Sequence, residues 1–243
     1  MADSPWTVVS FCDNLSLVKT KPWTIDHGLW TMKITLQNIG RRFNRDWIFR
    51  GIDHTFSDNK TCAILGPNGS GKSTLLQVLN GSLAPSIGKL SYFYDESEIE
   101  VSEVYKHLSL AAPYLELIEE FTLSEVIDFH FKFKPYKPGI DRNGVIDLLA
   151  MPGNKNKMIR YFSSGMKQRL KLALAFCSDT PMLMLDEPTS NLDSQGVDWY
   201  LSLVQKYAAN RLTIICSNQE HEYSFCDEQL SISDYKNPIS VKN

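Results

Sequence analysis

The stretch that decides the fold runs from Thr61 to Ser73 and reads TCAIL followed by GPNGSGKS. Its first part, Thr61 to Leu65, is a short apolar run that is typical of a strand buried on both faces. The second part matches the pattern G-x-x-x-x-G-K-[ST] and precedes a helix expected from Lys72 to about Asn80. Glycines in such a loop let successive backbone N–H groups turn toward a phosphate, and the helix adds its positive end. The stretch therefore predicts a phosphate-binding loop.

Two side chains of this loop are expected to have chemical roles. Lys72 is expected to reach the β- and γ-phosphates of a bound nucleotide, and the Ser73 hydroxyl to bind Mg²⁺. The phosphates are expected to be held by the whole loop: Gly66, Pro67, Asn68, Gly69, Ser70, Gly71, Lys72, Ser73 and Thr74. The simpler alternative is a glycine-rich turn that merely links a strand to a helix.

A second apolar strand, predicted over Met182 to Leu185, ends in two acids, Asp186 and Glu187. Two acids after a strand are by themselves more often a solvated strand end. Beside a phosphate-binding loop, however, an aspartate can order the shell of Mg²⁺, and a glutamate can orient and deprotonate water. We therefore expect Asp186 to be a metal ligand and Glu187 a catalytic base.

The rest of the chain alternates strands and helices, which predicts a mostly parallel sheet. Further strands are predicted over Lys33 to Ile39, Trp47 to Phe56 and Leu212 to Cys216, and further helices after Gly165 and over Val197 to Ala208. Residues from about 113 to 161 are aromatic, charged and interrupted by proline and glycine, which indicates an inserted helical subdomain. We place the start of the domain near Met32, so that it covers residues 32–243 and leaves residues 1–31 as an unassigned extension.

Composition and charge exclude several classes of protein. With 43% apolar and 22% charged residues, the 243-residue chain is neither disordered nor collagen-like nor a disulfide scaffold. A net charge of -3 argues against binding nucleic acid by bulk charge, so no nucleic-acid partner is expected. The five cysteines form no C-x-x-C pair, which favours reduced thiols in a cytosolic compartment. We find no apolar run near the ~18 residues that a membrane-spanning helix needs.

A third motif lies between the first two. Phe162 to Arg169 reads FSSGMKQR and opens a helix, for which Ser163 is suited as the N-cap. Its hydroxyl and the free N–H groups of Ser164 and Gly165 can bind an anion. Followed by LDEPTSNLD from Leu185 to Asp193, this order of motifs resembles the nucleotide-binding domain of the ATP-binding cassette (ABC) ATPases, over essentially residues 33 to 232.

The resemblance implies an α/β fold of the P-loop NTPase type, with a mostly parallel central sheet, a small antiparallel β subdomain and an inserted helical subdomain. It implies ATP and Mg²⁺ as ligands. It also implies a signature segment that binds the γ-phosphate of ATP held by the opposite subunit, formed here by Ser163, Ser164, Gly165 and Met166. Asp193 would lie in the loop that faces the second subunit. Phe43 fits the aromatic residue on which adenine stacks, and Trp47 competes with it for this role.

The sequence departs from the family pattern at several positions. Ala112 is expected where the family usually has a glutamine that touches the metal site. Asn218 is expected in place of the switch histidine, and it can donate a hydrogen bond but cannot become cationic. The alternative is that His221, three residues further on, reaches the site instead. In the signature segment, Ser164 replaces a glycine and Met166 replaces a glutamine.

The leading hypothesis is the ATP-hydrolysing subunit of an ABC transporter, with Glu187, Lys72 and Asn218 as catalytic residues. It would act as a homodimer or heterodimer, held on the cytoplasmic face of a membrane by a separate membrane-spanning permease subunit. The alternative is an ATP-dependent dimerising switch that regulates a partner without transport and hydrolyses ATP weakly. A small-molecule kinase is disfavoured, because the segments at Phe162 to Gln168 and Pro188 to Asp193 would then have no function.

Overall fold

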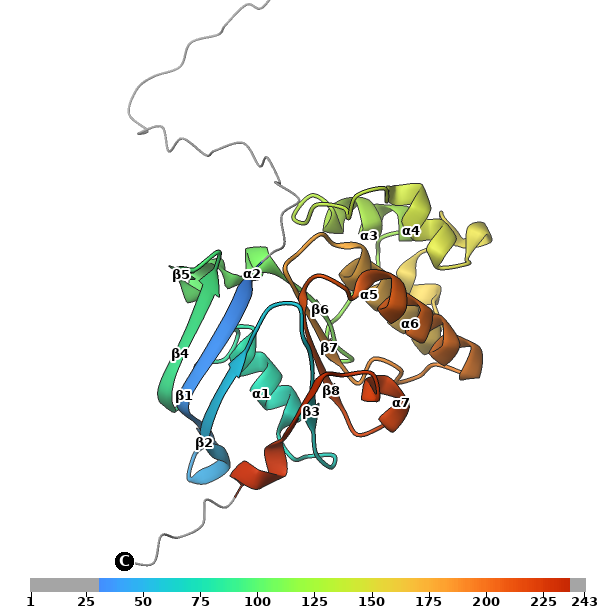
Figure 1. Ribbon diagram of the computed structural model, residues 1–243. Helices are drawn as coiled ribbons and strands as arrows, with labels where there is room; N and C mark the ends of the chain where they lie inside the picture. Colours follow the sequence, from blue (N-terminus) through green and yellow to red (C-terminus); the bar gives the residue numbers. More distant parts are fainter. Residues whose placement is uncertain (1–30, 237–243) are drawn as a thin grey trace, which may run out of the picture.

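The computed structural model describes residues 31–236, so the extension expected over residues 1–31 lies outside the described residues apart from Thr31. An antiparallel and a parallel sheet lie on either side of helix α1 (Lys72–Leu79), as Figure 1 shows. Helices α5 (Ser164–Cys177) and α6 (Ser194–Tyr207) cover the other face of the parallel sheet. The predicted α/β class with a second, antiparallel sheet is confirmed.

The parallel sheet has the strand order β6-β7-β8-β3-β9, and all of its pairs are parallel. Its strands are β6 (Leu108–Ala111), β7 (Met182–Asp186), β8 (Leu212–Ser217), β3 (Thr61–Leu65) and β9 (Glu228–Ser231). The predictions for β3, β7 and β8 are confirmed to within a residue at each end, whereas β9 was not predicted. Because β3, β7 and β8 are neighbours and parallel, the segments that follow them emerge at the same edge of the sheet.

The packing of β7 explains why its first four residues are all apolar. Met182 and Met184 pack toward α1 in one core cluster, and Leu183 and Leu185 pack toward α5 and α6 in another. Successive side chains of a strand point to opposite faces, so a strand covered by helices on both sides needs apolar residues at every position. This packing holds the end of β7 rigidly, and Asp186 with it.

The antiparallel sheet has the order β2-β1-β4-β5. It contains β1 (Met32–Phe43), β2 (Asp46–Phe56), β4 (Ile87–Tyr94) and β5 (Ser97–Ile99). The predicted strands at 33–39 and 47–56 are confirmed as parts of β1 and β2, and β1 continues further than predicted. Strands β4 and β5 were not predicted. Asp95 and Glu96 link them with positive φ angles of 47° and 63°, which is the geometry of a tight hairpin.

The segment from 113 to 161 contains two short helices, α3 (Leu123–His130) and α4 (Arg142–Leu148), joined by turns and 3₁₀ segments. Both helices pack against α5 around an apolar cluster that includes Ile127, Ile146 and Leu170. The other two helices are α2 (Val104–His107) and α7 (Glu220–Tyr223), each a single turn. Among residues 31–236, no helix combines the length and the apolar character needed to span a membrane.

Candidate functional site

The loop between β3 and α1 has a conformation that requires glycine. Gly71 has a φ of 107°, and a Cβ there would lie 2.4 Å from Cγ2 of Ile48. Gly69 has a φ of 72°. Both values lie in the left-handed region, which residues with a side chain rarely adopt. The loop can therefore turn its backbone sharply ahead of α1, as a phosphate cradle needs.

Lys72, at the start of α1, lies across this loop. Its side chain is buried, and Nζ donates hydrogen bonds to the carbonyl oxygens of Gly66 at 2.9 Å and Pro67 at 3.4 Å. Both partners are neutral, so the ammonium has no counter-ion among these contacts. A buried cation of this kind favours an anion in the loop.

Asp186, at the end of β7, is only 1% exposed. Burial raises the pKa of its carboxyl group, while a hydrogen bond with the Ser73 side chain opposes this effect. Its Oδ1 atom is buried and has no hydrogen-bond partner among the described residues. A buried carboxylate oxygen without a partner, beside a hydroxyl, is a donor set that fits Mg²⁺.

Glu187 follows directly and has a φ of 41°, an uncommon conformation for a residue other than glycine. Its N–H donates to the carbonyl of Cys216 at 2.9 Å, which fixes this conformation against β8. Strained backbone of this kind gathers at functional sites. Glu187 and the loop residues line one cavity of about 220 Å³. Its full lining consists of Ile48, Asn68, Gly69, Gly71, Lys72, Ser73, Thr74 and Glu187.

Asn218, after β8, also reaches the loop. Its Nδ2 donates to Oδ1 of Asn68 at 2.9 Å. His221 contacts a different segment, since its Nε2 lies 3.1 Å from Oγ1 of Thr189, which follows Glu187. Asn218 thus contacts the loop directly, whereas His221 contacts the segment after β7.

A buried carboxylate that the sequence did not single out joins the segments after β7 and β8. Glu222 is fully buried and accepts a hydrogen bond from the N–H of Thr189 at 2.7 Å. It also accepts hydrogen bonds from the hydroxyls of Thr189 and Ser217. These bonds fix the segments that carry Glu187 and Asn218 relative to each other.

The predicted cap of α5 is confirmed, since the side chain of Ser163 accepts a hydrogen bond from the N–H of Met166 at 3.2 Å. Gln168 in the same helix donates from Nε2 to the carbonyl of Pro188 at 2.9 Å. At Gly165, a Cβ would lie 2.9 Å from the carbonyl oxygen of Asn191. The start of α5 therefore packs closely against the segment after Glu187.

This helix start opens onto a cavity of about 420 Å³. It is lined by Leu149, Ala150, Met151, Ser163, Ser164, Gly165, Met166, Arg169, Asn191, Leu192 and Asp193. Asp193 is exposed and caps α6 by accepting from the N–H of Gly196 at 2.8 Å. Among the described residues, this cavity and the one around Lys72 share no lining residue. One chain thus presents the two predicted parts of the site in separate cavities.

Phe43 and Trp47 flank the turn between β1 and β2. The ring of Phe43 is 46% exposed, and the guanidinium of Arg41 lies 4.6 Å from its centre. Trp47 is less exposed and is approached by Arg42 and Arg50 at 5.6 Å and 5.1 Å. Phe43 is therefore the more accessible ring for a base, although a guanidinium already lies over it.

The sequence profile of the family described as "ABC transporter" matches residues 49–190, more than half of the chain. The chain belongs to the ABC transporter family. Among curated relatives of this ABC protein, the lantibiotic transport ATP-binding protein SrtF of Streptococcus pyogenes is 27% identical over 76% of this chain and 79% of its own length. The human retinal-specific phospholipid-transporting ATPase ABCA4 is 25% identical over 85% of the chain, which spans 9% of ABCA4.

Solved structures share the ABC fold. The bacterial ABC transporter cassette MJ0796, described as dimeric, superposes with a TM-score of 0.68 over 85% of this chain and 100% of that one, at 19% identity. The cbiO1 protein of Clostridium perfringens, described as part of the cbiONQ transporter complex, gives a TM-score of 0.63 over 82% and 83%, at 22% identity. At these identities, the likeness establishes the fold alone.

The departures from the ABC pattern can now be placed. Ala112 is fully buried after β6, and its carbonyl accepts a hydrogen bond from Nζ of Lys171 at 3.3 Å. Tyr114, two residues further on, was not singled out from the sequence. Its hydroxyl hydrogen-bonds the side chain of Gln77, and its pKa is raised to about 12 by burial and by the nearby charge of Asp186. Tyr114 thus lies close enough to Asp186 for the two groups to interact electrostatically.

Proposed function

We propose that this chain is the ATP-binding and ATP-hydrolysing subunit of an ABC transporter. The main support is that Lys72, Asp186 and Glu187, which are far apart in the sequence, meet at one edge of the parallel sheet beside the glycine-rich loop. Relatives whose printed names describe a transport ATP-binding protein and a transporting ATPase support the same function.

ATP and Mg²⁺ are the proposed ligands. Lys72 exchanges its two neutral carbonyl partners for oxygens of the β- and γ-phosphates, and backbone N–H groups of residues 68–74 hold the same phosphates. Ser73 and Asp186 hold the metal, which neutralises charge on the phosphates when bound. Phe43 is the proposed surface for the adenine ring.

Two residues at the open side of the loop are proposed to assist hydrolysis. Glu187 orients and deprotonates the attacking water. Asn218, already hydrogen-bonded to Asn68, donates an N–H to the terminal phosphate. An amide offers a neutral hydrogen bond where a protonated histidine would offer a charged one, so we expect slow hydrolysis.

The arrangement of the cavities supports action as a homodimer or heterodimer. The segment Ser163 to Met166 and the Lys72 loop line different cavities of one chain, which fits a site in which a second subunit brings such a segment to the phosphates. Asp193, exposed at the rim of the cavity around Ser163, would face that subunit. Binding of ATP would then close the dimer, and hydrolysis would reopen it.

We further propose a membrane-spanning permease as partner, with this chain peripheral on the cytoplasmic face of the membrane. The support lies in the segment from 113 to 161, where Phe129, Phe133 and Tyr161 are exposed. Phe133 is 68% exposed and its ring packs 5.2 Å from that of Phe129, so the two form an apolar surface suited to a protein partner.

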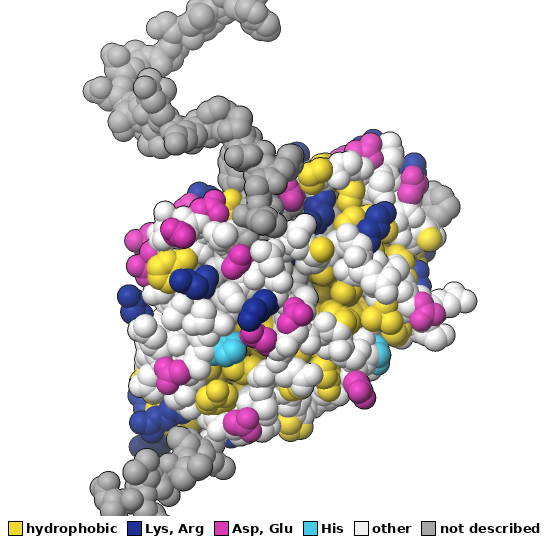
Figure 2. Space-filling model, viewed as in Figure 1, with side chains coloured by type: hydrophobic (Ala, Val, Ile, Leu, Met, Phe, Trp, Pro, Cys, Tyr) yellow, Lys and Arg dark blue, Asp and Glu magenta, His cyan; other side chains and the backbone are white. Residues whose placement is uncertain are grey.

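Nucleic acid is not proposed as a partner. Basic and acidic side chains are interspersed on the face shown in Figure 2, and a nucleic-acid surface needs a patch of basic groups. A regulatory switch without transport would use the same ATP site, but none of the relatives named above is a regulator by its printed name.

The test compares Mg²⁺-dependent ATP hydrolysis of the wild-type chain and Glu187→Gln, alone and with an integral membrane protein that co-purifies from solubilised membranes. We expect the wild type to release phosphate above the level of the variant. Equal release, with and without the membrane protein, would refute the hydrolase function. A phosphorylated acceptor in a metabolite mixture would support a kinase instead.

A further inference from the structure

Three side chains that bind metals in other proteins meet outside the nucleotide site. They are His54 on β2, Cys62 on β3 and Glu228 on β9. One ligand atom of each, the imidazole nitrogen, the thiol sulfur and a carboxylate oxygen, lies within 4.8 Å of the other two. The proposed ATP chemistry uses none of them.

The fold brings these side chains together from two sheets. Cys62 and Glu228 are direct register partners in the parallel pair β3 and β9, so their side chains project from the same face. His54 lies two residues from each of the buried residues Ile52 and Phe56 of β2, so all three side chains project from the same face of the strand. His54 therefore points toward the space between the sheets. The cluster joins the antiparallel sheet to the edge strand of the parallel sheet.

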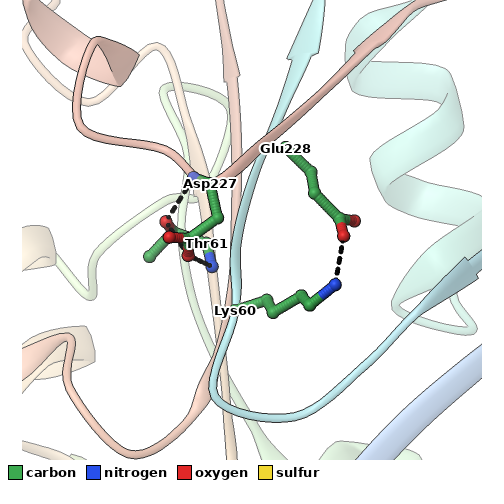
Figure 3. Close-up of polar contacts among 4 residues, drawn as sticks. All are labelled: Lys60, Thr61, Asp227 and Glu228. Carbon is green, nitrogen blue, oxygen red and sulfur yellow. Dashed lines mark hydrogen bonds and ion pairs between the residues drawn. The ribbon is translucent and has the colours of Figure 1, made fainter.

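Hydrogen bonds around β9 keep Glu228 in this position. Asp227 accepts from the N–H and the hydroxyl of Thr61, both at 2.8 Å. Figure 3 shows this pair on one side of the strands, with Glu228 and Lys60 meeting on the other side. The backbone at Glu228 is thus fixed beside Cys62, and its side chain reaches Lys60.

His54 offers a buried imidazole nitrogen to this cluster. Its Nε2 is buried and has no hydrogen-bond partner among residues 31–236. Burial lowers the pKa of the imidazole, which keeps it in the neutral form that binds metals. A buried ring nitrogen without a partner is unusual and calls for an explanation.

We propose that His54, Cys62 and Glu228 bind a zinc ion that ties β2 to β3 and β9. One nitrogen, one sulfur and one carboxylate oxygen form a set that suits Zn²⁺ and not Mg²⁺, which prefers oxygen ligands. A tetrahedral zinc ion holds its ligand atoms about 3.5 Å apart, so the side chains must close by about 1 Å. Water completes the fourth position.

One feature of the cluster competes with a metal ion. Lys60 is ion-paired with Glu228, but its side chain is 48% exposed and can turn into solvent. Cys62 binds the metal as a thiolate, so its proton is released to solvent on binding. Affinity for Zn²⁺ is therefore expected to increase when Lys60 is replaced by a neutral residue.

Co²⁺ is the probe for the test, because its spectrum reports both ligands and geometry. Added to the full chain without ATP, it is expected to give a sulfur-to-cobalt charge-transfer band and strong visible bands of a tetrahedral ion at one equivalent, all removed by Zn²⁺. Cys62→Ser is expected to abolish the charge-transfer band. Cys177→Ser is the matched control, because it removes a different buried thiol and should leave the band unchanged.

The remaining variants keep the proposal testable even if Cys62→Ser unfolds. His54→Ala is expected to weaken Co²⁺ binding at least tenfold, whereas His107→Ala, which replaces another half-buried imidazole of lowered pKa, should leave it unchanged. Lys60→Met is expected to tighten binding several-fold. Zn²⁺ should raise the Tm of the wild type and not that of His54→Ala.

Three results would overturn the zinc site. They are the absence of a charge-transfer band in the wild type, a band that persists in folded Cys62→Ser, and binding that neither His54→Ala nor Lys60→Met alters. These readouts need neither ATP nor hydrolysis. A chain that fails as an ATPase could still bind zinc, and the reverse also holds.

Discussion

The two halves of the proposed nucleotide site differ in their chemistry. The half that would hold the phosphates and the metal contains Lys72, which is buried, and Asp186, a buried aspartate with one oxygen that has no hydrogen-bond partner among the described residues. The half that would sense the terminal phosphate has Ala112 and Asn218 at the positions where we expect the glutamine and the histidine of the family, and it therefore lacks one side-chain amide and one ionisable ring. The difference suggests that binding of ATP and response to its terminal phosphate are separable in this chain, and each prediction below tests that separation.

The largest expected effect is on binding. Lys72→Ala should weaken ATP binding by about 3 kcal/mol, or about 100-fold, because charge-assisted hydrogen bonds to the phosphates are lost. Glu187→Gln should keep ATP binding and trap a dimer, since Glu187 is assigned to water and not to the nucleotide. Calorimetry and sedimentation measure the two effects. Equal loss of binding in both variants would show that Glu187 is assigned to the wrong role.

The next effect concerns the sensing half. Asn218→His should raise the rate of ATP hydrolysis about tenfold or more, because a positioned acid or base contributes about 10²–10⁴-fold in enzymes. If the cationic ring is the active form, the variant rate should fall as pH rises through about 6.5, a step that the wild type lacks.

Asn218→Ala is the control for this prediction. It removes the hydrogen bond to Asn68 and adds no titratable group. The same rate and pH profile in the alanine and histidine variants would mean that position 218 does not act on the terminal phosphate.

The phosphate loop could be predicted from sequence because its signal is local. The loop between Leu65 and Lys72 needs glycines whatever the rest of the chain does, and β7 needs an unbroken apolar run because helices cover both of its faces. The serine cap of α5 is local as well, since Ser163 bonds a residue three positions away.

The contacts between segments could not be predicted in the same way. Asn218 meets Asn68 across 150 positions, and Glu222 meets Thr189 across 33, because β3, β7 and β8 are neighbours in the sheet. Strand β9 has a single buried side chain, Leu230, so it shows no alternation. His221 is a candidate because it is the histidine three residues after the expected position, and its bond with Thr189 depends on where α7 lies, which the sequence does not show.

A smaller effect is expected at the proposed subunit contact. Ser163→Ala removes a helix cap, which costs about 1 kcal/mol. The variant should weaken the ATP-dependent dimer about fivefold or more. Nucleotide binding by the isolated subunit should stay nearly constant. Thr122→Ala is a matched control, because Thr122 caps α3 outside the cavity around Ser163. Sedimentation in the Glu187→Gln background measures both. Equal weakening by the two variants would indicate a general loss of stability.

The smallest effect tests whether Tyr114 compensates for Ala112. Tyr114→Phe keeps the ring and removes the hydroxyl that bonds Gln77. It should raise the Mg²⁺ concentration for half-maximal hydrolysis about twofold to threefold. This is the size expected for the loss of one hydrogen bond of about 0.5 kcal/mol. Tyr161→Phe, at an exposed tyrosine, is the control. An unchanged Mg²⁺ requirement would mean that Tyr114 does not replace the glutamine expected at the position of Ala112. The sensing half would then lack the hydrogen bond of that glutamine altogether, while the binding half keeps its lysine and aspartate.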